Sequence, residues 1–189
     1  MTSIDAVAGV AIGCNYAALD GGLMKRAKLF TAALLIASLP ATAMARGTTA
    51  QLVGTWRLVS ATQRMADGTE RPDPNVGAQG RGYIIYTPTG QVCAMLGHAD
   101  RARWASGDRP TAAEAMAIPE NMVAYCGTYT VDEAGGFVLH HVELDLSPNR
   151  AGTDRKRFFT ISGDRLVLRP APPLPNGVQD WTVTWRRVH

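Results

Sequence analysis

Short runs in which apolar and polar residues alternate follow one another through most of the chain after residue 50. Alternation with a period of two is typical of β-strands, because successive side chains point to opposite faces of a sheet. Clusters of Gly, Pro, Asn and Asp separate the runs and indicate turns. The pattern predicts eight strands, at residues 52–61, 82–87, 91–97, 123–131, 137–146, 154–161, 165–170 and 180–188.

The short turns predict antiparallel pairing of consecutive strands, with hairpins at 82–97, 123–146 and 154–170. An open meander would leave two exposed edges, and closure into a barrel removes them. Eight strands enclose an interior just wide enough for side chains or for one small ligand. We therefore expect an all-β fold over residues 46–189, a single antiparallel up-and-down β-barrel of about eight strands.

The segment at residues 98–122 is too long for a hairpin loop and has a different pattern. Thr111 and Glu114 have the spacing of a capping box, Pro110 precedes them, and helix-forming residues follow as far as Pro119. We expect one short helix here, lying over a mouth of the barrel. Long loops with their own helix are often lids or binding loops, and the alternative is a plug that completes the core.

Residues 1–45 do not fit the strand pattern and are interpreted as a leader. Residues 24–28 carry positive charges, residues 29–39 are apolar, and Ala43-Met44-Ala45 has the form of a cleavage site. The apolar run is shorter than the ~20 residues that a membrane-spanning helix needs. We expect a signal peptide at 24–45, cleaved after Ala45, and hence a periplasmic or secreted protein with no stable membrane anchor.

The residues before Met24 contain no Lys or Arg. A signal peptide begins with its charged region, so these residues are explained if the true start is Met24. The alternative is an unusually long amino-terminal region in front of the same signal peptide.

Composition narrows the classes of function. The chain is 46% hydrophobic and 19% charged, as is usual for a globular domain. The net charge is +3, but no basic run stands out, so we expect no nucleic-acid partner. Phosphate-cradling, dinucleotide-binding and nucleophile-elbow motifs do not occur, and no cofactor is implied.

Two cysteines, Cys93 and Cys126, follow the leader. In an oxidising compartment they can pair, and the disulfide would stabilise the fold by roughly 4 kcal/mol in the chain-entropy model. The alternative is a pair of buried, reduced thiols that pack as small apolar side chains. The spacing does not decide between these two states.

The histidines raise the question of a metal site. His140 and His141 are adjacent in a predicted strand, so they point to opposite faces and cannot bind one ion. His141 shares a face with Glu143, but no third ligand follows from the spacing, and we expect no metal. Instead, residues 141, 143 and 145 are expected to face solvent, while 140, 142 and 144 turn inward. His140 is then either a satisfied core residue or a polar contact for a ligand.

Six segments together resemble a known family. In chain order they are GTWRLVS, GYIIYTPTGQV, AYCGTYTVD, HHVELDLSPNRAGTDRKRFF, GDRLVLRP and the terminal WRRV. In this order they look like the bacterial and fungal lipocalin-like domain family, and the resemblance covers essentially the whole of residues 50–188. It implies a small lipocalin-like barrel that begins with G-T-W and ends with W-x-R.

The resemblance also implies how one end of the barrel is closed. Trp56 would pack across that end, and Arg187 of the last strand would lie over its ring in a cation–π contact. Gly54 would let the backbone pass close beneath the indole. These three residues are expected to be structural.

Arg157 matches an Arg of the family and would be directed into the barrel, toward an anionic or carbonyl group. The alternative is an ion pair with Glu143 or Asp145 across the hairpin, because a buried Arg needs a partner. Tyr86 and Tyr125 carry hydroxyls that could orient a ligand, or they could be ordinary cross-strand aromatics.

Trp104, together with several Met residues, could form a soft apolar wall near the barrel mouth. The expected ligand-binding residues are Tyr86, Trp104, Tyr125, His140 and Arg157. The expected function is reversible binding of a small, largely apolar molecule in the barrel cavity. One alternative is an enzyme of the isomerase or cyclase type that uses acid–base residues there. Another is a barrel filled by its own side chains that serves as a structural or interaction domain.

Overall fold

The computed structural model describes residues 48–189. The leader expected at residues 1–45, with its start at Met24 and its cleavage site, lies outside the described residues. Among residues 48–189, no helix is long and apolar enough to cross a membrane.

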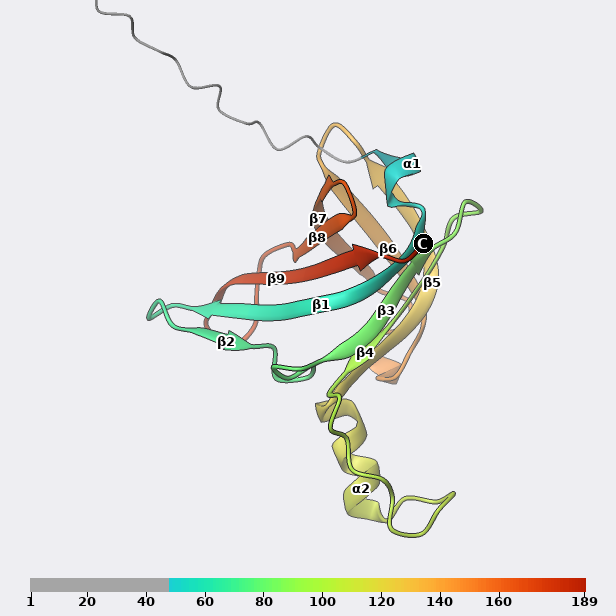
Figure 1. Ribbon diagram of the computed structural model, residues 1–189, viewed down its shortest axis with the longest axis vertical. Helices are drawn as coiled ribbons and strands as arrows, with labels where there is room; N and C mark the ends of the chain where they lie inside the picture. Colours follow the sequence, from blue (N-terminus) through green and yellow to red (C-terminus); the bar gives the residue numbers. More distant parts are fainter. Residues whose placement is uncertain (1–47) are drawn as a thin grey trace, which may run out of the picture. The chain divides into compact units, whose positions relative to one another are not determined.

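Antiparallel strands follow one another around a barrel in the order of the sequence (Figure 1). Short turns join most of them, as the Gly- and Pro-rich punctuation predicts. The strands are β1 (Gly54–Met65), β2 (Glu70–Pro72), β3 (Arg81–Tyr86), β4 (Gln91–Gly97), β5 (Met122–Asp132), β6 (Phe137–Asp145), β7 (Asp154–Ser162), β8 (Arg165–Pro170) and β9 (Val178–Arg187).

The sheet closes because β1 pairs with β3 on one side and with β9 on the other. Eight strands, β1 and β3 to β9, therefore form the closed antiparallel barrel that the sequence predicts. The short strand β2 was not predicted, and it pairs only with residues 62–64 near the end of β1. β1 itself continues four residues beyond its predicted end at residue 61.

A β-bulge in β6 reverses the predicted faces at the end of that strand. Cys126 pairs with Leu144 but the next residue, Gly127, pairs with Val142, so Glu143 is an extra residue without a partner in β5. Because one extra residue exchanges the two faces of a strand, Leu144 is 70% exposed.

The carboxylate of Asp145, in contrast, is buried, with its side chain only 2% exposed. The prediction that Leu144 faces inward and Asp145 outward was therefore wrong. Gly127 makes room for the bulge, since a Cβ there would overlap the carbonyl oxygen of His141.

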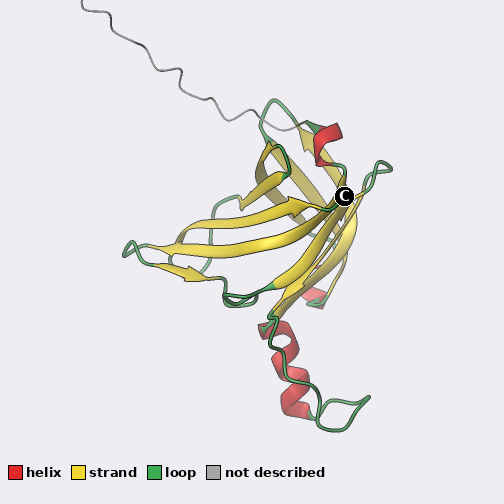
Figure 2. Cartoon of the chain, in the orientation of Figure 1, coloured by secondary structure: helices red, strands yellow, loops and turns green. Residues whose placement is uncertain are grey.

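The expected helix forms as α2 (Ala112–Ala117), and the capping box between Thr111 and Glu114 is present. The 3₁₀ turn η1 (Ile118–Glu120) connects it to β5. Figure 2 shows α2 extending away from the ends of β4 and β5, and none of its residues is buried or lines the barrel cavity. The helix prediction is confirmed, but α2 does not cover the cavity.

Two other short helical segments lie outside the predicted set. They are α1 (Thr49–Leu52), just before β1, and the 3₁₀ turn η2 (Pro148–Arg150), between β6 and β7. Both are a single turn long, which is too short for an apolar period of 3.6 residues to be visible in the sequence.

Trp56 lies at one end of the barrel and is completely buried. The guanidinium of Arg187 is 4.1 Å from the centroid of its ring, and the two residues are direct partners across β1 and β9. Arg187 also donates to the carbonyl oxygens of Val53, at 2.9 Å, and Gln51, at 2.5 Å. One side chain thus ties the last strand to the segment that precedes the first.

Gly54 has a backbone φ of +137°, which residues with side chains rarely adopt. A Cβ at this position would lie 2.7 Å from Nη1 of Arg187. The glycine therefore makes room for the guanidinium, whereas the sequence had suggested that it makes room beneath the indole.

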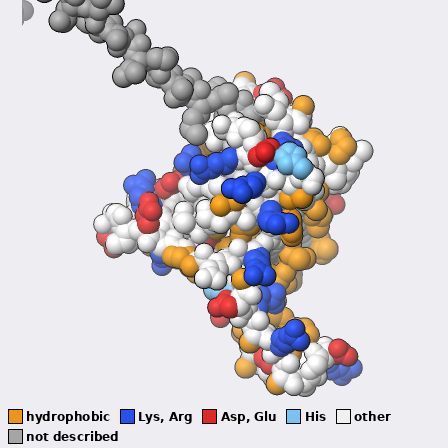
Figure 3. Space-filling view, viewed as in Figure 1, with side chains coloured by type: hydrophobic (Ala, Val, Ile, Leu, Met, Phe, Trp, Pro, Cys, Tyr) orange, Lys and Arg blue, Asp and Glu red, His pale blue; other side chains and the backbone are white. Residues whose placement is uncertain are grey.

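Cys93 and Cys126 form a disulfide between β4 and β5, where they are direct cross-strand partners with Cα atoms 4.1 Å apart. Cys93 is exposed, so the bond lies on the outer face of the barrel. Exposed apolar side chains surround it, including Ile85 and Met95, and Figure 3 shows apolar side chains along this flank of the barrel. Of the two states left open by the sequence, the structure has the disulfide.

Candidate functional site: a cavity inside the barrel

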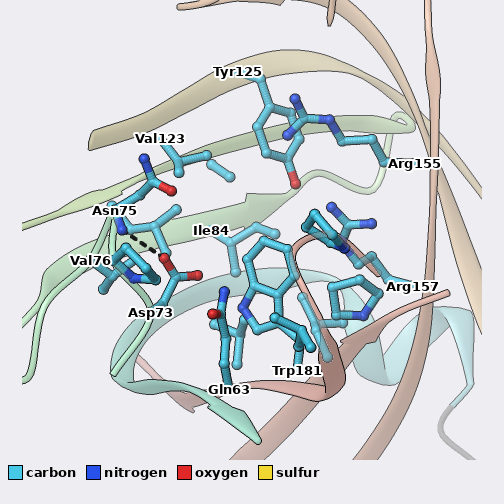
Figure 4. Close-up of a pocket in the computed structure, with 18 of the residues that line it drawn as sticks. Gln63, Asp73, Asn75, Val76, Ile84, Val123, Tyr125, Arg155, Arg157 and Trp181 are labelled. Carbon is cyan, nitrogen blue, oxygen red and sulfur yellow. Dashed lines mark hydrogen bonds between the residues drawn. The ribbon is translucent and has the colours of Figure 1, made fainter. Parts of the chain in front are cut away.

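A cavity of about 500 Å³ occupies the interior of the barrel. This volume lies within the usual range for pockets that bind small molecules. The walls come from almost every strand, and Figure 4 shows the side chains that face the space. Trp56 does not line the cavity, which lies toward the other end of the barrel, beside the end of β1 and the start of β9.

Most of the wall is apolar, so the cavity favours a ligand with an apolar body. The apolar lining residues are Pro74, Val76, Ile84, Ala94, Leu96, Val123, Leu168, Pro170, Pro175, Val178, Trp181, Val183 and Trp185.

Arg157 projects into the cavity from β7. The only hydrogen bond of its side chain within the described chain is from Nη1 to the carbonyl oxygen of Lys156, at 3.0 Å. Asp145 instead pairs with Arg155, with 2.5 Å between Oδ2 and Nη2, and Glu143 is exposed. The alternative of an ion pair between Arg157 and either carboxylate was therefore wrong.

A hydrogen-bonded row of three side chains, which we call the Tyr–His–Tyr row, crosses the wall behind the cavity. His140 is completely buried at its centre. Its Nε2 lies 2.8 Å from the hydroxyl of Tyr86, and its Nδ1 lies 2.9 Å from the hydroxyl of Tyr125. Burial, reinforced by the positive charges of Arg157 and Arg155, lowers the pKa of His140 to about 3. The imidazole is therefore uncharged at neutral pH.

Both tyrosines of the row are neutral phenols as well. Burial raises the pKa of Tyr86 well above its usual value and also raises the pKa of Tyr125. Tyr125 is the member of the row that lines the cavity. The guanidinium of Arg155 stacks over its ring, 4.5 Å from the centroid, and holds the ring in place.

A second polar group lies across the cavity, where the loop after β2 enters the barrel. Asp73 is buried there, and burial raises the pKa of its carboxyl. Its Oδ1 accepts a hydrogen bond from the backbone N–H of Asn75 at 2.8 Å, drawn in Figure 4. Beside it, Oε1 of Gln63 accepts two hydrogen bonds from Arg71, at 3.1 and 3.2 Å.

The structure thus separates the predicted ligand-binding residues into three groups. Tyr125 and Arg157 line the cavity, while Tyr86 and His140 lie in the wall behind Tyr125. Trp104 lies in the loop after β4, is 37% exposed and does not line the cavity. Its predicted place in the wall was wrong, because that loop and α2 extend away from the barrel.

Other lining residues were missed by the sequence analysis. Trp181, Val183 and Trp185 alternate along β9 and all face the cavity, so the WTVTW pattern contained the signal for them. Asp73 lies between two prolines and has the appearance of an exposed turn residue. Nothing in the sequence around it indicates burial.

Within residues 48–189, no group of three or more His, Cys, Asp or Glu side chains is placed to hold a metal ion.

A closed antiparallel barrel with one sealed end and an internal cavity defines a lipocalin-type barrel. The chain belongs to the lipocalin-like domain family, whose model matches residues 53–188. It is 34% identical over 74 residues to the 4′-hydroxy-3′-methoxypropiophenone carrier protein of Aspergillus oryzae, which covers 35% of this chain and 67% of that protein. Among solved structures, the wild-type fluorescent protein UnaG is similar with a TM-score of 0.35 and 11% identity, over 75% of this chain and 100% of that one.

Proposed function

We propose that this protein binds a small, largely apolar molecule reversibly in its barrel cavity and acts as an exported carrier of that molecule. The observation that carries the proposal is the cavity itself, about 500 Å³ of space inside the barrel with apolar walls and a few polar groups. The leader pattern at residues 24–45 is the support for export.

The relative from Aspergillus oryzae adds independent support. Its name describes a carrier of an aromatic ketone with hydroxyl and methoxy substituents. A molecule of that kind has an apolar ring and several oxygen acceptors. The same combination would suit apolar walls with hydrogen-bond donors between them.

The enzyme alternative has weaker support. His140 was the candidate for acid–base catalysis, but it does not line the cavity, and both of its ring nitrogens are hydrogen-bonded to tyrosines. An effective general base has a pKa near the working pH, whereas the pKa of His140 is lowered to about 3. The Tyr–His–Tyr row suits the positioning of Tyr125 better than proton transfer to a substrate.

Binding is tested with a neutral, apolar fluorescent probe, N-phenyl-1-naphthylamine, and two single variants of neighbouring residues in β4. Ala94 faces the cavity, and Met95 is exposed on the outer face. We expect the protein to bind the probe, Ala94→Phe to weaken binding at least about tenfold by filling the space, and Met95→Phe to leave it unchanged. Equal affinity in all three proteins would place the probe outside the barrel and contradict the proposal.

A further inference from the structure

Arg157 is a cation inside the barrel without a carboxylate partner. Among the described residues, no Asp or Glu side chain lies within ion-pair distance of it. A guanidinium carries five N–H donors, and only one hydrogen bond to the protein is present. Arg157 is partly buried, and removing a cation from water is costly unless an anion or several acceptors face it. The remaining donors therefore indicate a partner that enters the cavity.

The surroundings of Arg157 reinforce its positive charge. Four of the residues that line the cavity are Arg, and one, Asp73, is acidic. Arg155 is neutralised by Asp145, and Asp73 lies on the opposite side of the cavity (Figure 4). The potential near Arg157 therefore favours a negatively charged group.

The Tyr–His–Tyr row determines what Tyr125 offers to the same space. An uncharged imidazole donates through one nitrogen and accepts through the other. The hydroxyl of Tyr86 is fully buried, and His140 is its hydrogen-bond partner. If Tyr86 accepted from Nε2, its own proton would be buried without an acceptor, which is unfavourable. Tyr86 therefore donates to Nε2, and the imidazole proton lies on Nδ1.

From Nδ1 that proton is donated to the oxygen of Tyr125. The hydroxyl proton of Tyr125 is then left for a partner in the cavity. Figure 4 shows this hydroxyl and the guanidinium of Arg157 on the same side of the space. Deeper in the barrel, the indole Nε1 of Trp185 is buried and also lacks a hydrogen-bond partner within the described chain. The free polar positions on these three residues are all donors.

We propose that the ligand is an amphiphilic acid, with an apolar body and one anionic oxygen group that Arg157 and the hydroxyl of Tyr125 bind together. The anionic group is a carboxylate or a phenolate, since both present acceptors and no donor. His140 is a positioning residue that keeps the hydroxyl proton of Tyr125 directed at the ligand. This proposal rests on the proposed function, because it assigns the chemistry of the ligand in the same cavity.

The test compares probes of similar size and shape that differ in charge. The carboxylate pair is naphthalene-2-carboxylate and its carboxamide, and the phenolate pair is 4-nitrophenolate and 4-nitroanisole. Calorimetric titration at pH 8 should show that an anion binds at least about tenfold more tightly than its neutral counterpart, as charge-assisted hydrogen bonds imply. The pair with the larger ratio identifies the head group.

Matched variants locate the effect. Arg157→Met removes the inward charge and should reduce the ratio of the two affinities to about one, whereas Lys156→Met removes the charge of its outward neighbour and should leave the ratio unchanged. Tyr125→Phe removes only the hydroxyl and should reduce the ratio severalfold. If Arg157→Met does not fold, Tyr125→Phe still decides the proposal.

The role of His140 has its own spectroscopic test. Nitrogen-15 NMR of the imidazole should show a proton on Nδ1 in the wild-type protein at pH 7, and Tyr86→Phe should reduce that preference. A proton on Nε2 in the wild type would overturn the positioning role.

The outcomes separate the two proposals. If none of the probes binds the wild-type protein and N-phenyl-1-naphthylamine does not bind either, the proposed function fails. If neutral probes bind as tightly as their anionic counterparts, the cavity is a binding site but the amphiphilic-acid proposal is overturned.

Discussion

His140 is a residue whose ionisation is coupled to the stability of the barrel. It is completely buried between two tyrosines, and its protonated form would place a second positive charge beside Arg157. One of its nitrogens would also lose its role as an acceptor. Protonation is therefore coupled to unfolding.

The barrel should lose stability in acid through His140. In the unfolded chain His140 takes up a proton below about pH 6.5, but in the folded protein only near pH 3. Because the unfolded state binds more protons in between, the free energy of unfolding should fall as the pH drops through this window. The contribution of His140 at pH 4.5 should be a loss of about 2 to 3 kcal/mol relative to pH 7. Urea unfolding at the two pH values measures it.

The control for this prediction is His140→Gln, whose amide can donate to one tyrosine and accept from the other. Its stability should depend less on pH between 7 and 4.5. Asp73 acts in the opposite direction, because its raised pKa means that the folded state binds the carboxyl proton more tightly. The comparison of wild type with His140→Gln cancels that contribution. An identical pH slope in the two proteins would contradict the prediction.

The sequence predicted which single residues face the interior better than it predicted their partners. The family pattern picked out Arg157, and strand alternation turned His140 inward, because both depend on sequence order alone. The pattern did not reveal that Asp145 binds Arg155 rather than Arg157. That choice depends on which carboxylates face the interior of the barrel. The pairing of β5 with β6 decides this.

At the scale of elements, the bulge in β6 has the largest consequence for the site. It moves the carboxylate of Asp145 to the inner face, where it pairs with Arg155. Arg155 is then fixed over the ring of Tyr125. A sequence periodicity of two cannot show a bulge, because the extra residue is defined by its pairing with another strand.

The second element-scale feature is the disulfide, and it gives the next prediction. It joins β4 to β5 across the segment that contains α2, with a sequence separation of 33 residues. Replacing both cysteines, as Cys93→Ser with Cys126→Ser, should lower the free energy of unfolding by about 2 to 4 kcal/mol, because the unfolded chain gains freedom. Thermal or urea unfolding measures the loss.

The bond lies on the outer face, so ligand affinity at a temperature where the variant is folded should be unchanged. Wild-type protein unfolded in the presence of a reductant should match the double variant. A stability that responds to neither treatment would mean that the cysteines do not pair in solution.

At the scale of the whole molecule, one contact closes the barrel at its sealed end. Arg187, near the end of the chain, lies over Trp56 and binds two carbonyl oxygens of the segment before β1. The contact adds to the antiparallel pairing of β1 with β9, in which Trp56 and Arg187 are opposite each other. These contacts join the first and last strands, so they form only when the entire barrel is assembled.

The geometry of this contact makes Arg187 sensitive even to a substitution that keeps its charge. Arg187→Lys keeps the charge but loses the planar fork that binds two carbonyls while stacking on the ring. We expect the free energy of unfolding to fall by about 2 to 4 kcal/mol, through the lost hydrogen bonds and the weaker cation–π contact. The neighbouring Arg186 is exposed, and Arg186→Lys should change stability by less than about 0.5 kcal/mol. Equal effects of the two substitutions, measured by urea unfolding, would show that the contact is not structural.

The sequence by itself determined the eight barrel strands, although not β2, together with their antiparallel order and the closure of the barrel. These follow from local alternation, turn residues and the need to remove exposed edges. It also indicated the capped helix, whose signal lies within four consecutive residues, Thr111 to Glu114.

Only the tertiary structure decided where Trp104 and α2 lie, which carboxylate Arg155 binds, and that Asp73 is buried beside the cavity. The cavity and the direction of the Tyr125 hydroxyl were decided there as well. The physical reason is that each of these depends on side chains from distant strands meeting in one place. Whether a side chain is buried and hydrogen-bonded depends on these contacts between distant strands, and a local pattern of residues does not contain that information.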